Sequence, residues 1–104
     1  MYNRYLEKKL ELMPDDENLG SKIPIELEYY IIEKIDNGFY NKEFENKSYG
    51  IEIVKKIDDS KYESEMLKEI SECIENTKKI LNRLVDNTVT PMEMAVVIDD
   101  ILSE

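Results

Sequence analysis

The sequence of 104 residues contains no histidine and no tryptophan, only one cysteine and only three glycines. Without histidine, the chain lacks the commonest general base, the base that activates serine and cysteine nucleophiles, and the usual nitrogen ligand of zinc, copper and iron. The single thiol, Cys73, excludes an internal disulfide and a metal site built from several thiolates. The glycines Gly20, Gly38 and Gly50 stand far apart, so no phosphate-binding glycine loop is formed. These absences predict a protein with no catalytic residues, no cofactor and no metal site.

Carboxylates are the reactive groups that remain. Asp15–Glu17, Asp58–Asp59 and Asp99–Asp100 offer oxygen atoms that could bind Mg²⁺ or Ca²⁺ or serve in acid–base hydrolysis. None of these clusters matches an EF-hand loop, and a chain with 24 acidic residues contains such neighbours by chance. A carboxylate-dependent hydrolase is therefore the least favoured of three hypotheses.

The chain carries a net charge of −10. This charge disfavours direct contact with nucleic acid or anionic lipid, since both require clustered lysine and arginine. A charged partner is expected to be basic, unless the acidic surface only keeps the protein in solution. No uncharged run approaches the roughly 20 residues that span a bilayer, and the N-terminus lacks the apolar region of a secretory signal. We expect a cytoplasmic protein with no membrane association, and the abundance of lysine, isoleucine and asparagine is typical of AT-rich bacterial and phage genes.

The length fits a single domain covering residues 1–104. Helical spacing of apolar residues predicts a first helix over residues 3–13, which Pro14 ends. The stretch 14–21 is expected to be a linker. The apolar residues of 23–36 fit either a helix with a stop at Asn37-Gly38 or a strand with alternating side chains, and we favour the helix.

The next segment, residues 39–57, contains the predicted β structure. Residues 39–45 and 49–57 are expected to form a short pair of strands, because Tyr49, Ile51 and Ile53 alternate with Gly50 and Glu52.

Two further helices complete the prediction. Ser60–Glu63 reads as a capping box that opens a long helix to about Asp86, with Cys73 on the flank of its apolar side. Thr90–Glu93 repeats the signal, with proline in the first turn, and predicts a helix to about Leu102 that folds back on the long one. The fold class is thus α+β and predominantly helical, with three to four helices and a small β-hairpin. The alternative is a three-stranded meander plus helices.

Two surface features suggest protein binding. Glu65, Glu69 and Glu72 share the outer face of the predicted long helix, where their spacing could imitate nucleic-acid phosphates for a basic groove. The alternative is an ordinary solvated face, completed by the lysine and arginine residues downstream. In the last helix, acidic residues at the C-terminal end oppose the helix dipole, and Val96 adds an apolar point beside them. The residues concerned in the last helix are Glu93, Val96, Asp99 and Asp100, with Glu104 beyond them.

The preferred hypothesis is a small, acidic, non-enzymatic inhibitor that occupies a basic surface of another protein. Phage-encoded inhibitors of host defence nucleases, such as anti-CRISPR proteins, and toxin-neutralising immunity proteins act in this way. The second hypothesis is a homodimer assembled through helices. It rests on the long helix, which at about 40 Å would exceed a domain diameter of roughly 34 Å and carries apolar residues at heptad spacing.

Overall fold

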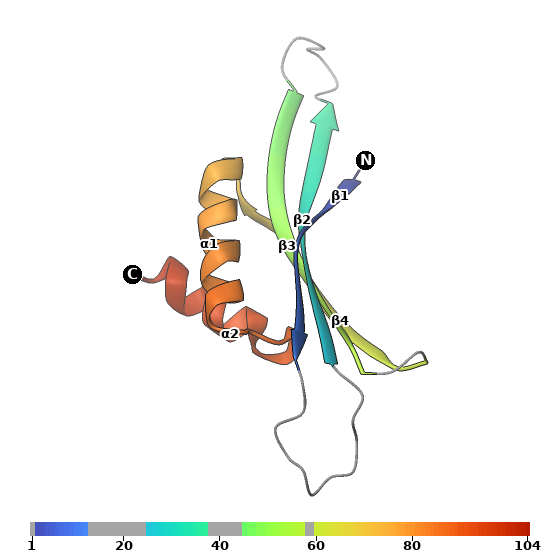
Figure 1. The fold of residues 1–104 in the computed structure, drawn as a ribbon. Coiled ribbons are helices and arrows are strands. Elements are labelled where there is room, and N and C mark those ends of the chain that lie inside the picture. Colours follow the sequence, from blue (N-terminus) through green and yellow to red (C-terminus); the bar gives the residue numbers. More distant parts are fainter. Residues whose placement is uncertain (1, 13–24, 38–44, 58–59) are drawn as a thin grey trace, which may run out of the picture.

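The computed structural model describes residues 2–12, 25–37, 45–57 and 60–104 (Figure 1). These residues form one antiparallel sheet and two helices. The strands are β1 (Tyr2–Leu12), β2 (Ile25–Asn37), β3 (Glu45–Lys56) and β4 (Tyr62–Ser71). The helices are α1 (Ile74–Asp86) and α2 (Pro91–Leu102). The sheet has the order β1-β2-β3-β4, so each strand pairs with its neighbour in the chain.

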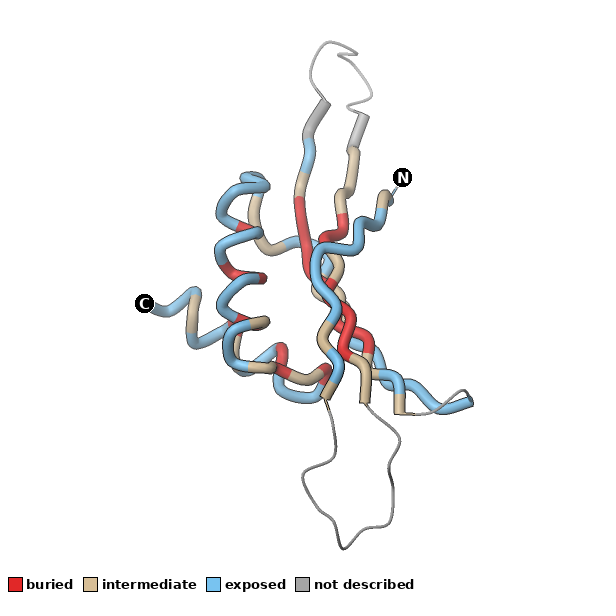
Figure 2. The backbone as a smooth tube through the Cα atoms, viewed as in Figure 1, coloured by how far each residue is buried: buried red, intermediate tan, exposed pale blue. Residues whose placement is uncertain are grey.

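Both helices of the described residues lie on the same face of the sheet, and we call the other the helix-free face (Figure 1). Helix α1 contacts β2, β3 and β4, whereas α2 contacts β3 and β4. Strand alternation places Leu27, Tyr29 and Ile31 of β2 under the helices, opposite Ile51 and Ile53 of β3, and all five side chains are fully buried. The core therefore lies between the two central strands and the helical layer (Figure 2).

A hydrogen bond from the sheet holds the turn between the two helices. The Tyr29 hydroxyl donates to the Val89 carbonyl oxygen at 2.8 Å inside the core. Burial, together with the nearby Glu93 carboxylate, raises the pKa of Tyr29 to about 12, so this hydroxyl keeps its proton. The bond satisfies a buried carbonyl group that would otherwise destabilise the turn.

The prediction of a predominantly helical protein with three to four helices was wrong, because four strands form a single sheet. The predicted helix over 60–86 is in fact strand β4 followed by α1, a helix of 13 residues. Leu67 and Ile70 lie on the strand, so the heptad seam that supported a helix-mediated dimer is not formed. Cys73, expected on the flank of the apolar side of that helix, lies at the start of α1 and is exposed.

The predicted helix over residues 3–13 is strand β1. A β-bulge between Leu6 and Lys8 shifts the alternation, so that Leu6 points to one face and Leu10 to the other. A second irregularity in β4 sets Tyr49 opposite Ser71 but Ile51 opposite Leu67. Inserted residues change the spacing of apolar residues along a strand from two positions to three or four. That spacing is typical of a helix, which explains why both strands were predicted to be helices.

The remaining predictions had mixed outcomes. The favoured helix over 23–36 was wrong, and the alternative strand is correct, as β2. The second predicted strand, 49–57, is confirmed as part of β3, and the helix expected after Thr90 is confirmed as α2 with its capping box. The linker 14–21 and residues 39–44 of the first predicted strand lie outside the described residues. Neither α1 nor α2 has the length and apolar content to cross a membrane.

Candidate protein-binding surface

Helix α2 carries acidic residues and no lysine or arginine. Its buried side, with Met94 and Ile98, packs on the sheet. On the opposite side, Met92 is 83% exposed and Val96, one turn later, is 66% exposed. Asp99 and Asp100 follow within the next turn and are exposed. We call Met92, Val96, Asp99 and Asp100 the α2 surface.

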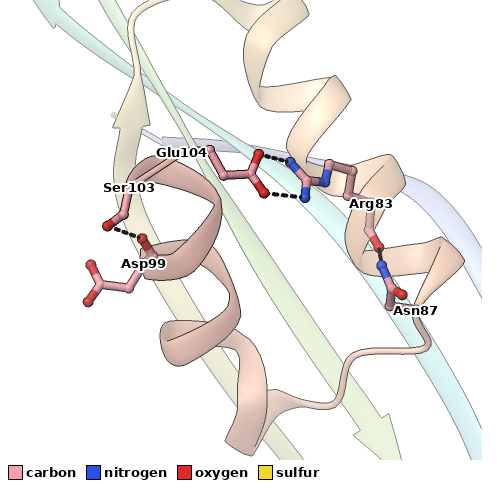
Figure 3. A network of polar contacts seen from close by, with 5 residues as sticks. All are labelled: Arg83, Asn87, Asp99, Ser103 and Glu104. Atoms are coloured by element: carbon pink, nitrogen blue, oxygen red, sulfur yellow. Dashed lines mark hydrogen bonds and ion pairs between the residues drawn. The ribbon is translucent and has the colours of Figure 1, made fainter.

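The carboxylates of Asp99 and Asp100 make no ion pair with any residue that the structure describes. They lie in the last turn of α2, where backbone carbonyl groups already concentrate negative charge. Ser103 donates a hydrogen bond at 2.8 Å to the backbone oxygen of Asp99 and not to the Asp99 carboxylate (Figure 3). This is the local conflict with the helix dipole that the sequence predicts.

Glu104, the third acidic group near this helix end, is compensated. Its two oxygens accept hydrogen bonds from Arg83 of α1, both at 2.7 Å (Figure 3). The guanidinium donor lowers the pKa of Glu104, so its carboxylate stays charged. The pair joins the chain terminus to α1 and removes Glu104 from any acidic binding surface, whereas Asp99 and Asp100 remain.

Glu93 belongs to the start of α2 and has a structural role. Its carboxylate accepts hydrogen bonds from the Thr90 hydroxyl at 2.7 Å and from the Thr90 backbone N–H at 3.3 Å. The Thr90 hydroxyl is the main cause of the lowered pKa of Glu93. Glu93 is therefore a capping residue that adds charge next to Met92.

The predicted stripe of Glu65, Glu69 and Glu72 does not exist. Glu65 lies opposite the buried Ile53 and so shares the helix-covered side of the sheet, although its own side chain is exposed. Glu69 pairs with Lys34 at 2.6 Å, and this ammonium group lowers its pKa. Glu72 lies between β4 and α1. The three carboxylates come from a bent strand and a connection, so the phosphate-like spacing was wrong.

The helix-free face of the sheet holds a polar network that sequence reasoning missed. Arg4 donates to Glu52 at 2.5 Å, and its guanidinium lies 3.6 Å from the centre of the Tyr30 ring. Lys56 pairs with Glu28 at 3.0 Å. Once the register is known, these groups occupy adjacent positions across β1, β2 and β3, but no local motif reveals them.

An open hollow of about 400 Å³ lies over this network. Its two carboxylates, Glu28 and Glu52, are both paired with cations. Burial is the largest single effect on Glu28 and raises its pKa. The hydrogen bond from Lys56, the charge of Lys56 and smaller contributions together outweigh burial, so the pKa of Glu28 is lowered. A permanently charged, paired carboxylate is a poor general acid or base near neutral pH.

Replacing Lys56 with methionine should destabilise the protein at pH 7, because Glu28 is only 7% exposed and would lose its cation. In the native protein the lowered pKa of Glu28 gives stability that is lost as the pH falls below its ordinary value of 4.5. In the variant, burial alone would raise that pKa, so protonation would relieve the damage. Urea unfolding should show a larger difference between the proteins at pH 7 than at pH 4, and the difference should decrease further as the pH is lowered. A Lys78→Met control on the exposed surface of α1 should show no such pH dependence.

Among the described residues, no group of three or more cysteine and acidic side chains is placed to hold a metal ion. Asp99 and Asp100 are among the described residues, whereas Asp15–Glu17 and Asp58–Asp59 lie outside them.

The fold and the exposed surfaces define a two-layer α+β protein, with a four-stranded antiparallel meander and two C-terminal helices on one face. The chain belongs to DUF6514, a family of unknown function, whose sequence profile matches residues 8–104. No curated protein and no solved structure matches the chain.

Proposed function

We propose that the protein is a non-enzymatic binding protein that uses the α2 surface to occupy a basic surface on another protein. The observation that carries the proposal is the pair Asp99 and Asp100 at the end of α2, which make no ion pair with the described residues and lie beside the exposed Met92 and Val96. Each acid costs the helix a few tenths of a kcal/mol. A partner with lysine or arginine residues around a small apolar pocket would offset that cost on binding.

Features elsewhere in the molecule support a binding role over catalysis. The hollow on the helix-free face has paired carboxylates, and the chain has no histidine. The partner class is a basic protein such as a nuclease or a toxin, and the effect of occupancy is inhibition. The proposal includes a cytoplasmic site of action, which suits an exposed, unpaired Cys73 because reducing compartments preserve thiols.

The decisive variant is Asp100→Lys. It should weaken partner binding by about 2 kcal/mol, roughly thirtyfold in Kd, because a cation would then face the partner's cations. The same change should slightly raise the melting temperature, because lysine in the last turn favours the helix dipole. Affinity capture from the producing cells followed by titration of the captured protein measures the first effect, and thermal unfolding measures the second.

Asp86→Lys is the matched control. Asp86 is also exposed and also occupies the last turn of a helix, α1, so the change in charge and the benefit to the dipole are the same. This control should bind the partner like the native protein. Equal binding by both variants and the native protein would refute the α2 surface, and equal loss in both variants would show that only net charge matters.

A further inference from the structure

Strand β1 forms an edge of the sheet. It pairs with β2 along its length, and no described strand pairs with its other side. The helices lie over β2, β3 and β4. Three large hydrophobic residues of β1, Tyr2, Tyr5 and Leu6, are each about half exposed. An uncovered edge strand of eleven residues without proline is a template for pairing with another strand.

The bulge in β1 restricts how two copies of this edge can pair. Before it, Tyr2, Arg4 and Leu6 point to the helix-free face, opposite Lys34, Ile32 and Tyr30. After it, Lys8, Leu10 and Leu12 point to the helix side, opposite Tyr29, Leu27 and Ile25. Two copies related by a two-fold axis through the sheet keep their helical layers on the same side. Opposing residues must then share a face.

These conditions allow two registers of equal length, with the two-fold axis at Leu6 or at Lys8. We choose the second, because the first would place Lys9 opposite Arg4 of the second copy. The two-fold axis passes between Lys8 and its own copy, and the bulged Glu7 is skipped on both strands. The next pairs are Lys9 with Leu6, Leu10 with Tyr5, Glu11 with Arg4, and Leu12 with Asn3 of the second copy. Every one of these pairs joins residues on the same face of the sheet. A register that did not skip Glu7 would fail, because a two-fold axis would then pair residues of equal parity, and across the bulge these lie on opposite faces of the sheet.

The side chains in this register are complementary. Glu11, which has no ion pair within the described residues, faces Arg4 of the second copy. The Nε atom of Arg4 is used by Glu52, and its terminal nitrogens remain available. Leu10 faces Tyr5, which extends the apolar contact. The two Lys8 side chains are the one unfavourable pair, and the adjacent Glu7 of each copy supplies an equal number of negative charges.

We propose that β1 pairs antiparallel with β1 of a second copy of this chain, joining two four-stranded sheets into one of eight strands. The dimer covers the β1 edge, leaves β4 as the edge strand at each end of the joined sheet, and keeps both α2 surfaces open on the same side. Because α2 packs on β3 and β4, which lie beyond β2 from this edge, the dimer can be tested independently of the proposed function.

Cysteine cross-linking tests the register directly. In a Cys73→Ser background, Lys8→Cys places two Cβ atoms about 5 Å apart across the axis, near the separation in a disulfide. Lys9→Cys is the matched control, because it also removes one exposed lysine but puts its two Cβ atoms about 7–8 Å apart. Mild oxidation should cross-link the first variant rapidly and the second slowly.

Sedimentation of the native chain gives the second readout. The expected mass at high concentration is twice 12.3 kDa. Glu11→Lys should raise the dimer dissociation constant by about tenfold, since two ion pairs are reversed. Glu63→Lys, on strand β4 at the opposite end of the sheet, should leave it unchanged. A strict monomer up to millimolar concentration would overturn the proposal, and so would a dimer in which Lys8→Cys cross-links no faster than Lys9→Cys.

Discussion

Replacing Gly50 with alanine is expected to lower the free energy of unfolding by about 3 kcal/mol, near the upper end for forcing extra atoms into a packed site. A Cβ atom at Gly50 would lie 1.9 Å from the carbonyl oxygen of Leu67 and 2.6 Å from that of Lys68. Both contacts are with backbone, so no side-chain rotation relieves them. The irregular part of β4 therefore has to move away from β3.

The close approach at Gly50 also explains a buried side chain on the helix-free face. Ile32 lies opposite Gly50 in the register of β2 and β3 and is 2% exposed, although no helix covers this side. The crossing of β4 over Gly50 shields this part of the sheet. Alanine should thus expose Ile32 as well as strain β4.

Urea unfolding of Gly50→Ala measures the loss, with Ser48→Ala as the control. Ser48 lies two residues earlier on the same strand and has the same orientation, but it pairs with Lys34 at a regular part of the sheet. The control should change stability by less than about 0.5 kcal/mol. Comparable stability for Gly50→Ala and the native chain would mean that β4 does not cross β3 as described.

Replacing Met94 with alanine should cost about 3 kcal/mol, within the range found for truncating buried methionine. Met94 is fully buried and belongs to the core between α2 and the sheet. The cavity left by the change would lie where α2 meets β3 and β4, so the helix would lose its main apolar contact. We expect the loss to appear in thermal unfolding as a decrease in the melting temperature of roughly 12 °C or more.

Met92→Ala is the internal control for this prediction. Met92 occupies the same helix two residues earlier and is 83% exposed, so its truncation should leave stability nearly unchanged. If the two variants were equally stable, the orientation of α2 would be wrong, and the α2 surface would be wrong with it. The pair thus tests which side of α2 faces the partner before any partner is known.

The sequence predicted the parts of the fold that follow local rules. Helix α2 is predicted by Thr90, Pro91 and Glu93, which form a capping signal within four residues. Strand β3 shows regular alternation over Tyr49 to Ile53, with Gly50 among its outward positions. In both cases the information lies within one segment, so no knowledge of the partner strand is needed.

The parts that could not be predicted depend on pairing between distant segments. The bulges in β1 and β4 are properties of two strands together, and in one strand alone they imitate helical spacing. A capping-box pattern at Ser60 strengthened the error, although residues 62–71 are a strand. Pairing of β4 with β3 and its packing against α2 outweigh the helix propensity of its glutamate, methionine and leucine residues.

The candidate surface was predicted only in part. Val96, Asp99 and Asp100 fall together because α2 was correctly assigned, and Met92 could have been added from its four-residue spacing to Val96. The ion pair that removes Glu104 from the acidic surface needed the position of Arg83 on α1. The predicted stripe of Glu65, Glu69 and Glu72 was wrong because the long helix on which they were placed is not formed.

The central claim is that the exposed side of α2 contacts a basic partner. The most direct measurement is the amount of partner captured by Asp100→Lys divided by the amount captured by Asp86→Lys, at equal bait concentration below saturation. Our account predicts a ratio well below one, at about one thirtieth for the affinity loss given above. A ratio of one, with both variants folded, would contradict it.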